Sequence, residues 1–234
     1  MDAAERLIVA LDYQDRASAM RLVDKLEGTV SWYKVGLQLY LAEGRALVEE
    51  LRTRGYDVFL DLKLHDIPHT VAGAVQSVVG CGAGLLTIHA SGGSLMMDAA
   101  VDAAAKTSDA PRLLAVTVLT SMSQAQLNTI GVAGDLSAHV LRLGQMALQS
   151  GVDGLVCSAH EIQNFRAHIA ADALLVVPGI RSANATQDDQ QRTATATEAI
   201  QWGASMLVIG RPITQAADPA VAADLLLREI AAAI

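Results

Sequence analysis

The chain has 234 residues, of which 52% are hydrophobic and 18% are charged, and its formal net charge at pH 7 is −8. This length and apolar content predict one folded domain, residues 1–234, and exclude a wholly disordered chain. The negative charge and an aromatic content of only 3% argue against a nucleic-acid-binding surface, which needs clustered cations and stacking side chains.

Short apolar runs recur along the chain and predict strands. In chain order these runs are Leu7–Leu11, Trp32–Val35, Val58–Leu62, Leu85–Ile88, Leu113–Leu119, Gly154–Cys157, Leu174–Val177 and Met206–Ile209. Because they lack polar alternation, they are typical of strands buried on both faces of a parallel sheet. None approaches the roughly 20 apolar residues of a membrane-spanning helix, so we expect no membrane segment.

Each apolar run is followed by a longer segment with apolar residues near helical spacing. These predicted helices are Gln14–Leu26, Tyr40–Arg54, Thr70–Val79, Leu95–Ala105, Leu136–Gln149, Glu161–Ile169, Thr195–Trp202 and Pro219–Ala233. Eight strand–helix pairs predict the α/β class and a single-domain (β/α)8 TIM barrel. A doubly wound open sheet is the main alternative.

The start of the chain and the cysteines indicate the compartment. Asp2 and Glu5 precede the first apolar run, so these residues do not resemble a basic, apolar secretory leader. Cys81 and Cys157 lie far apart and show neither CxxC nor metal-ligand spacing, which favours buried thiols. We therefore expect a cytoplasmic protein that binds no metal.

Ionisable residues gather at the ends of the first three predicted strands. Asp12 follows the first run, Lys34 lies in the second, and Asp61 and Lys63 lie at the end of the third. In a parallel barrel these ends surround one mouth, where active sites form. Asp61 and Lys63 are two residues apart and should project to the same face, and nearby carboxylates would keep the lysine protonated. The alternative is a ring of salt bridges that only closes the barrel.

Two further features lie near this mouth. Asp66 adds a carboxylate, although it is equally suited to be the N-cap of a helix that begins near Pro68. After the seventh and eighth strands, the sequences PGIRS (178–182) and VIGRPIT (208–214) combine glycine with Arg181 and Arg211. Glycine allows close backbone approach and arginine makes charged contacts, so both segments predict a phosphate site.

Several motifs together resemble the bacterial orotidine 5'-phosphate decarboxylase family over almost the full length. The central motif is DLKLHDIPHT (61–70), accompanied by the segments around Asp12 and Lys34, TIHASGG from Thr87, AVTVLTSM from Ala115, PGIRS and VIGRPIT. The shorter D-x-K-x-x-D element also occurs in related sugar-phosphate barrels. Two positions depart from the family pattern: Leu64 replaces a frequent aromatic residue, and His69 replaces a common Asn.

The resemblance implies a function and a role for each matching residue. The expected reaction is decarboxylation of orotidine 5'-monophosphate to uridine 5'-monophosphate, without metal or organic cofactor. Lys34, Asp61, Lys63 and Asp66 would form an alternating charge network, with Lys63 as the proton donor. Asp12 and Lys34 would contact the ribose hydroxyls, Thr120 the pyrimidine, and Arg181, Gln190, Gly210 and Arg211 the phosphate region. A one-residue shift would exchange Gln190 for Gln191.

The family also implies an assembly. Asp66, Ile67 and Thr70 would reach the active site of a neighbouring subunit, which implies a homodimer with shared sites. Three alternatives stay open at this point: a magnesium-dependent sugar-phosphate decarboxylase or aldolase, a sugar-phosphate isomerase or epimerase, and a non-catalytic barrel that binds a phosphate ligand.

Overall fold

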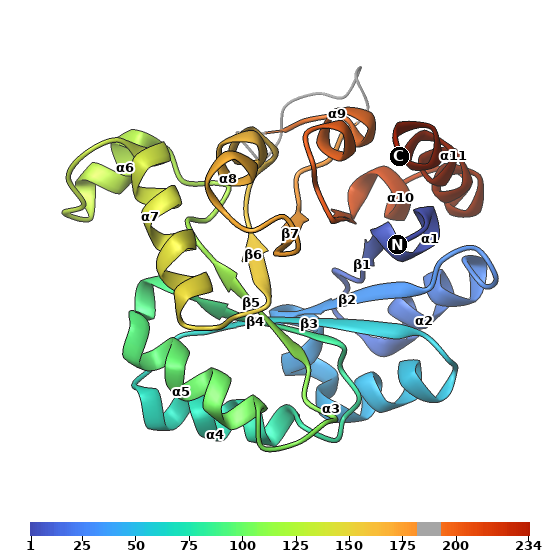
Figure 1. Ribbon diagram of the computed structural model, residues 1–234. Coiled ribbons are helices and arrows are strands. Elements are labelled where there is room, and N and C mark those ends of the chain that lie inside the picture. The colour runs from blue at the N-terminus through green and yellow to red at the C-terminus, as the bar shows by residue number, and fades with distance from the viewer. Residues whose placement is uncertain (182–192) are drawn as a thin grey trace.

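The computed structural model describes residues 1–181 and 193–234, and in them eight parallel strands close into a barrel (Figure 1). The strands follow one another in chain order, and β8 pairs with β1 to complete the ring. Their bounds are β1 Leu7–Ala10, β2 Trp32–Gly36, β3 Asp57–Leu64, β4 Leu85–His89, β5 Arg112–Val116, β6 Gly154–Val156, β7 Leu174–Val177 and β8 Met206–Ile209. The predicted barrel is confirmed, and the open sheet is wrong.

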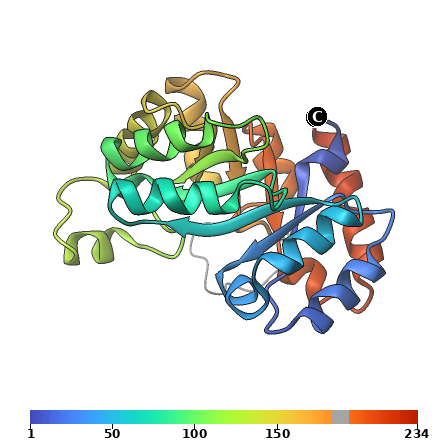
Figure 2. The ribbon, with the colours of Figure 1, turned by 90° about the horizontal axis from the view of Figure 1, so that it is seen from below.

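Helices cover the outside of the barrel (Figure 2). The eight expected helices are α2 Arg16–Lys25, α3 Leu37–Thr53, α4 Pro68–Val78, α5 Ser94–Ala104, α7 Leu136–Gln149, α8 Ile162–His168, α9 Ala196–Gln201 and α11 Pro219–Ala233. Short elements not predicted from sequence are α1 Ala3–Arg6, α6 Gln124–Thr129, α10 Arg211–Thr214, and the 3₁₀ turns η1 Ala90–Gly92 and η2 Ala159–Glu161. Within the two described ranges, no helix is both long and apolar enough to cross a bilayer.

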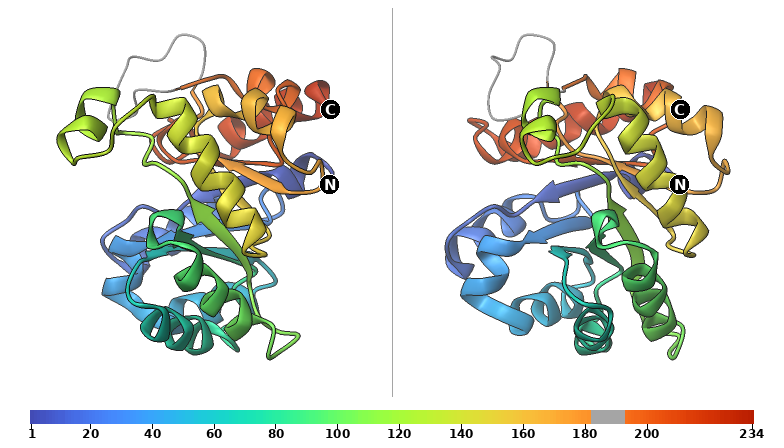
Figure 3. Two further views of the ribbon diagram at one scale, coloured as in Figure 1. Left: turned by 60° about the vertical axis from the view of Figure 1, so that its left-hand side comes forward. Right: turned by 90° about the vertical axis from the view of Figure 1, so that its left-hand side faces the viewer.

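The two ends of the chain lie on the same side of the barrel (Figure 3). There, α1 and α11 are in contact with each other. The opposite side carries α6, which stands away from the ring of helices.

Side-chain caps define where many helices begin. Asp15 accepts a hydrogen bond from the Ser18 N–H at the start of α2, and Asp135 accepts one from the Ala138 N–H at the start of α7. Asp218 does the same for α11, which has proline in its first turn. Such caps satisfy amide groups that have no partner within the helix. They therefore mark the residue at which each of these helices begins.

The core has two layers, separated by the wall of the barrel. The inner layer fills the barrel with Ile8, Ala10, Trp32, Phe59, Leu85, Leu114, Leu174, Val176, Met206 and Val208. The outer layer packs the alternate strand residues against the helices. Because the inner layer is solid, a ligand can enter the barrel only above it, at the ends of the strands.

Two strands differ from the prediction by more than one residue at an end, and both differences affect the barrel mouth. β5 ends at Val116 instead of Leu119, because its neighbour β6 ends at Val156 and offers no further ladder. β3 continues to Leu64, but its register with β4 shifts between Leu60 and Leu64. Within this irregularity Lys63 has φ 50°, a left-handed conformation that is uncommon for any residue except glycine.

Candidate active site

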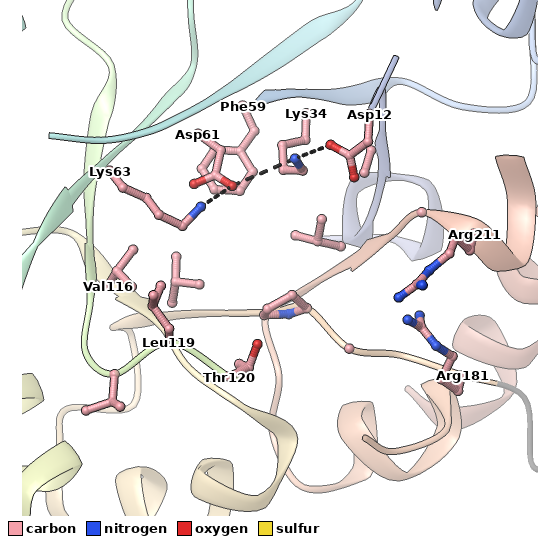
Figure 4. A pocket seen from close by; sticks show the side chains of 17 residues that line it. Asp12, Lys34, Phe59, Asp61, Lys63, Val116, Leu119, Thr120, Arg181 and Arg211 are labelled. Carbon is pink, nitrogen blue, oxygen red and sulfur yellow. Dashed lines mark hydrogen bonds and ion pairs between the residues drawn. The ribbon is translucent and has the colours of Figure 1, made fainter. Parts of the chain in front are cut away.

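A pocket opens at the carboxyl ends of the strands (Figure 4). Its walls come from strands on several sides of the barrel and from the turns after β7 and β8. The lining residues are Ala10, Asp12, Lys34, Phe59, Asp61, Lys63, Val116, Val118, Leu119, Thr120, Val156, Pro178, Gly179, Arg181, Val208, Gly210 and Arg211. This set includes most of the site residues predicted from the sequence.

One wall carries an alternating row of charges, formed by Lys63, Asp61, Lys34 and Asp12, which we call the charged row. Asp61 Oδ2 lies 2.7 Å from Lys63 Nζ and 3.8 Å from Lys34 Nζ. Lys34 Nζ also lies 2.9 Å from Asp12 Oδ1. The middle of the row is buried: the exposed fraction of the side chain is 13% for Asp61 and 11% for Lys34, against 62% for Asp12.

The electrostatics of the row keep Asp61 ionised. Burial by itself would raise the pKa of this carboxyl, but the charges of Lys34 and Lys63 and the hydrogen bonds from Lys63 and Thr87 outweigh it. The net result is a pKa below the usual value of 3.8. At neutral pH a carboxylate therefore lies between two ammonium groups, which holds the Lys63 ammonium at the pocket wall.

The opposite end of the pocket is cationic. The guanidinium groups of Arg181 and Arg211 point into the pocket at the end away from Lys63 (Figure 4). Gly179 has φ 82°, which favours glycine, and Gly210 is the residue before α10. Two guanidinium groups beside glycine backbone suit an anion such as a phosphate.

Three predicted site residues lie elsewhere. Asp66, Ile67 and Thr70 are exposed and do not line this pocket, and in the described part of the chain Asp66 makes no ion pair with either lysine. Asp66 Oδ1 accepts a hydrogen bond from the Ile67 N–H at 2.7 Å. The N-cap of α4 is Ile67 and no side chain caps it, so the N-cap interpretation of Asp66 is wrong. Gln190, and its neighbour Gln191, lie outside the described residues.

Two histidines lie near Lys63 without forming a metal site. The rings of His65 and His89 are 5.4 Å apart and inclined by 39°. Burial, followed by the positive charges of His65 and Lys63, lowers the pKa of His89 below 6.5. No cluster of three or more His, Cys, Asp or Glu side chains suited to a metal ion occurs among residues 1–181 and 193–234.

Sequence reasoning missed two residues that shape the charged row. Gly36 ends β2, and a Cβ at this position would lie 2.8 Å from Lys34 Nζ, so only glycine leaves the ammonium its place. The role of Gly36 could have been predicted from the sequence, because Gly36 is two residues from Lys34 on one strand and shares its face. Thr87 contacts Asp61 and Lys63 from β4, and that contact depends on a strand register that no local pattern reveals.

Comparison with family models gives a match along nearly the whole chain. Residues 5–226 match the model described as the orotidine 5'-phosphate decarboxylase / HUMPS family. A protein of Alkalilimnicola ehrlichii named orotidine 5'-phosphate decarboxylase is 49% identical over 227 residues, which cover 97% of each chain. One of the same name from Anaeromyxobacter sp. is 48% identical, covering 95% of this chain and 97% of that protein.

Solved structures agree with this match. A crystal structure of orotidine 5'-phosphate decarboxylase from Lactobacillus acidophilus has a TM-score of 0.86 and 37% sequence identity, covering 97% of this chain and 99% of that one. An uncharacterized conserved protein from Geobacillus kaustophilus has a TM-score of 0.84, also at 37% identity, covering 96% and 99%. The similarity therefore extends over the whole barrel.

Proposed function

The chain belongs to the orotidine 5'-phosphate decarboxylase / HUMPS family, and from this membership together with the geometry of the pocket we propose how it works. The enzyme is a carboxy-lyase of pyrimidine biosynthesis that converts orotidine 5'-monophosphate to uridine 5'-monophosphate. One observation carries the proposed mechanism. A partly buried ammonium group and a cationic anion site face each other across one pocket, as a nucleotide with a reacting base at one end and a phosphate at the other requires.

The proton donor is Lys63. Loss of CO2 from C6 of the pyrimidine leaves an electron pair in an in-plane orbital that the ring cannot delocalise. An ammonium group placed beside C6 stabilises this charge as it develops and then donates its proton to the carbon, so electrostatic stabilisation and general acid catalysis come from one group. The buried carboxylate of Asp61 holds this ammonium in place, and Lys34 supports Asp61 from its other side.

Asp61 has a second effect, on the substrate carboxylate. Two negative charges about 4 Å apart repel by roughly 4 kcal/mol at an effective dielectric constant near 20. This repulsion disappears when neutral CO2 leaves, although the two neighbouring lysines screen part of it. Stabilisation of the carbanion by Lys63 therefore supplies the larger share of the rate enhancement.

The remaining contacts orient the nucleotide. Asp12, at the exposed end of the charged row, and Lys34 beside it bind the ribose hydroxyls. Thr120 binds the pyrimidine from the wall after β5, and Arg181, Gly210 and Arg211 bind the phosphate. The family resemblance alone assigns Gln190 to the phosphate region as well.

The active unit is a homodimer in which each subunit completes the site of the other through Asp66, Ile67 and Thr70. Exposed apolar side chains support this proposal: Ile67 is 66% exposed after β3, and the helices that follow the strands on either side, α3 and α5, carry Leu41 at 81% and Leu95 at 76%. Exposed apolar groups near the starts of helices that follow neighbouring strands are typical of a surface that a second copy covers. The carboxylate of Asp66 lies in the same region, outside its own pocket.

We also propose that the enzyme works in the cytoplasm. The chain has only two cysteines in 234 residues, Cys81 and Cys157, and both are buried; so low a cysteine content suits a reducing compartment. Fractionation of the host cell with an antibody against the chain tests this.

One assay tests the reaction and the role of Lys63 together. Loss of orotidine 5'-monophosphate is followed by absorbance for the wild type and for Lys63→Ala, each with and without EDTA. We expect turnover that EDTA leaves unchanged and that the substitution abolishes. Turnover that EDTA stops would favour a magnesium-dependent barrel of the sugar-phosphate type, and undiminished turnover by Lys63→Ala would remove the proposed proton donor.

A further inference from the structure

We propose that Thr87 is a positioning residue for the reaction: its single hydroxyl holds the backbone of Lys63 and the carboxylate of Asp61 in the arrangement that catalysis needs. The proposal rests on the proposed function, because it concerns the geometry of the proton donor. Thr87 lies on β4 and is fully buried. It does not line the pocket, so it acts through the other two residues.

The strand register explains why a side chain is needed here. Leu60 pairs with Leu86 and Leu64 pairs with Ile88, so three residues of β3 face the single residue Thr87. A regular ladder cannot satisfy the amides of such a bulge. The Lys63 N–H instead donates to Thr87 Oγ1 at 2.8 Å, and Lys63 keeps its left-handed φ of 50°.

Thr87 Oγ1 makes a second hydrogen bond, as a donor. Because Oγ1 accepts from the Lys63 N–H, the hydroxyl proton is free to be donated, and Asp61 Oδ1 lies 3.0 Å away as the acceptor. Asp61 Oδ2 is then left to face the ammonium groups of Lys63 and Lys34. The two carboxylate oxygens thus have separate tasks, one toward Thr87 and one toward the lysines.

This arrangement accounts for how a lysine in an uncommon conformation is held without a glycine. A non-glycine residue at positive φ persists only where its surroundings fix it. Here Lys63 is held at both ends, its backbone by Thr87 Oγ1 and its ammonium by Asp61. Without the hydroxyl, the Lys63 N–H and Asp61 Oδ1 both lose a buried partner.

The test compares Thr87→Val, which keeps the shape and removes the hydroxyl, with Thr87→Ser, which keeps the hydroxyl. A matched control is Thr117→Val, since Thr117 is also buried, directly after β5, and its hydroxyl donates to the Val156 carbonyl at 3.5 Å. We expect Thr87→Val to lower kcat about 10- to 100-fold with little change in KM, because a charge-assisted hydrogen bond is lost and the phosphate contacts are remote. Thr87→Ser should restore most of the activity, and Thr117→Val should keep it.

Two further readouts separate positioning from general loss of structure. The acid limb of the kcat/KM profile should move to higher pH in Thr87→Val, because Asp61 loses a hydrogen bond that stabilises its charged form. A crystal structure of folded Thr87→Val should show Lys63 outside the left-handed region. Wild-type kcat, an unchanged pH profile and unchanged φ at Lys63 in Thr87→Val would overturn the proposal, whereas an inactive wild type would instead overturn the proposed function.

Discussion

At the scale of single residues, the charged row pairs each ammonium group with a carboxylate at one wall of the pocket. The Lys63 ammonium is 2.7 Å from Asp61, and Lys34 is 2.9 Å from Asp12. A buried ammonium without such a partner would lose its proton to avoid desolvation. Each carboxylate of the row offsets the desolvation of the ammonium beside it, and Gly36 leaves the space that the Lys34 ammonium occupies.

Gly36→Ala tests how much space the row needs. The new Cβ would lie 2.8 Å from Lys34 Nζ and 3.5 Å from Asp12 Oδ1, so the ammonium must move. The backbone at Gly36 has φ −92°, which alanine adopts freely, and the fold should keep its stability. We expect kcat/KM to fall about 10- to 100-fold while the melting temperature stays within a few degrees. Full activity in this variant would show that the position of Lys34 is not critical.

His89 predicts how stability depends on pH. Burial and neighbouring positive charge lower the pKa of His89 below 6.5. Between the lowered pKa and 6.5 the unfolded chain binds more protons than the folded chain, so the free energy of unfolding decreases as the pH falls through this window and is regained above it. His89→Gln should flatten this dependence, as measured by urea unfolding at a series of pH values. An unchanged slope between pH 5 and 6.5 would mean that His89 is not responsible.

At the scale of elements, β3 matters most, because its bulge delivers both Asp61 and Lys63 to one wall of the pocket. The apolar runs predicted all eight strands, and the strand ends predicted the charged row, since both follow from local patterns. The predicted end of β5 at Leu119 was wrong. Val118 and Leu119 are apolar, but they line the pocket beyond the end of the strand. The bulge and the contact of Thr87 depend on pairing between distant segments, which a local pattern does not contain.

Two glycine substitutions test the packing of the elements. In Gly154→Ala the new Cβ meets the backbone of Leu174 on β7, 2.9 Å from its Cα, and neither strand can move within the barrel. We expect a loss of about 3 kcal/mol in the free energy of unfolding. Gly73→Ala is the matched control, because its Cβ meets nothing within 4 Å inside α4, and should raise stability by about 1 kcal/mol. Equal effects of the two substitutions on thermal unfolding would contradict this packing.

At the scale of the whole molecule, the barrel places the charged row and the two arginines at opposite ends of one pocket. The first half of the chain supplies the charged row, and the second half supplies Arg181 and Arg211. The proposed dimer would add Asp66 of a second copy beside Lys63. A single chain would then contain all the binding groups but an incomplete charge network.

Mixed dimers test the shared site. Lys63→Ala and Asp66→Asn should each be nearly inactive as homodimers. Coexpression at equal levels should restore about a quarter of the wild-type activity, because half of the dimers are mixed and each of these has one intact site. Activity equal to the sum of the two homodimers, or an active Asp66→Asn homodimer, would show that Asp66 does not serve the neighbouring subunit.

The central claim is that the Lys63 ammonium meets the negative charge that forms on C6. The most direct measurement is a crystal structure of the wild-type enzyme with uridine 5'-monophosphate bound. We predict Lys63 Nζ within about 3.5 Å of C6, with the phosphate between Arg181 and Arg211. A bound nucleotide whose C6 is out of reach of Lys63 Nζ would contradict the account.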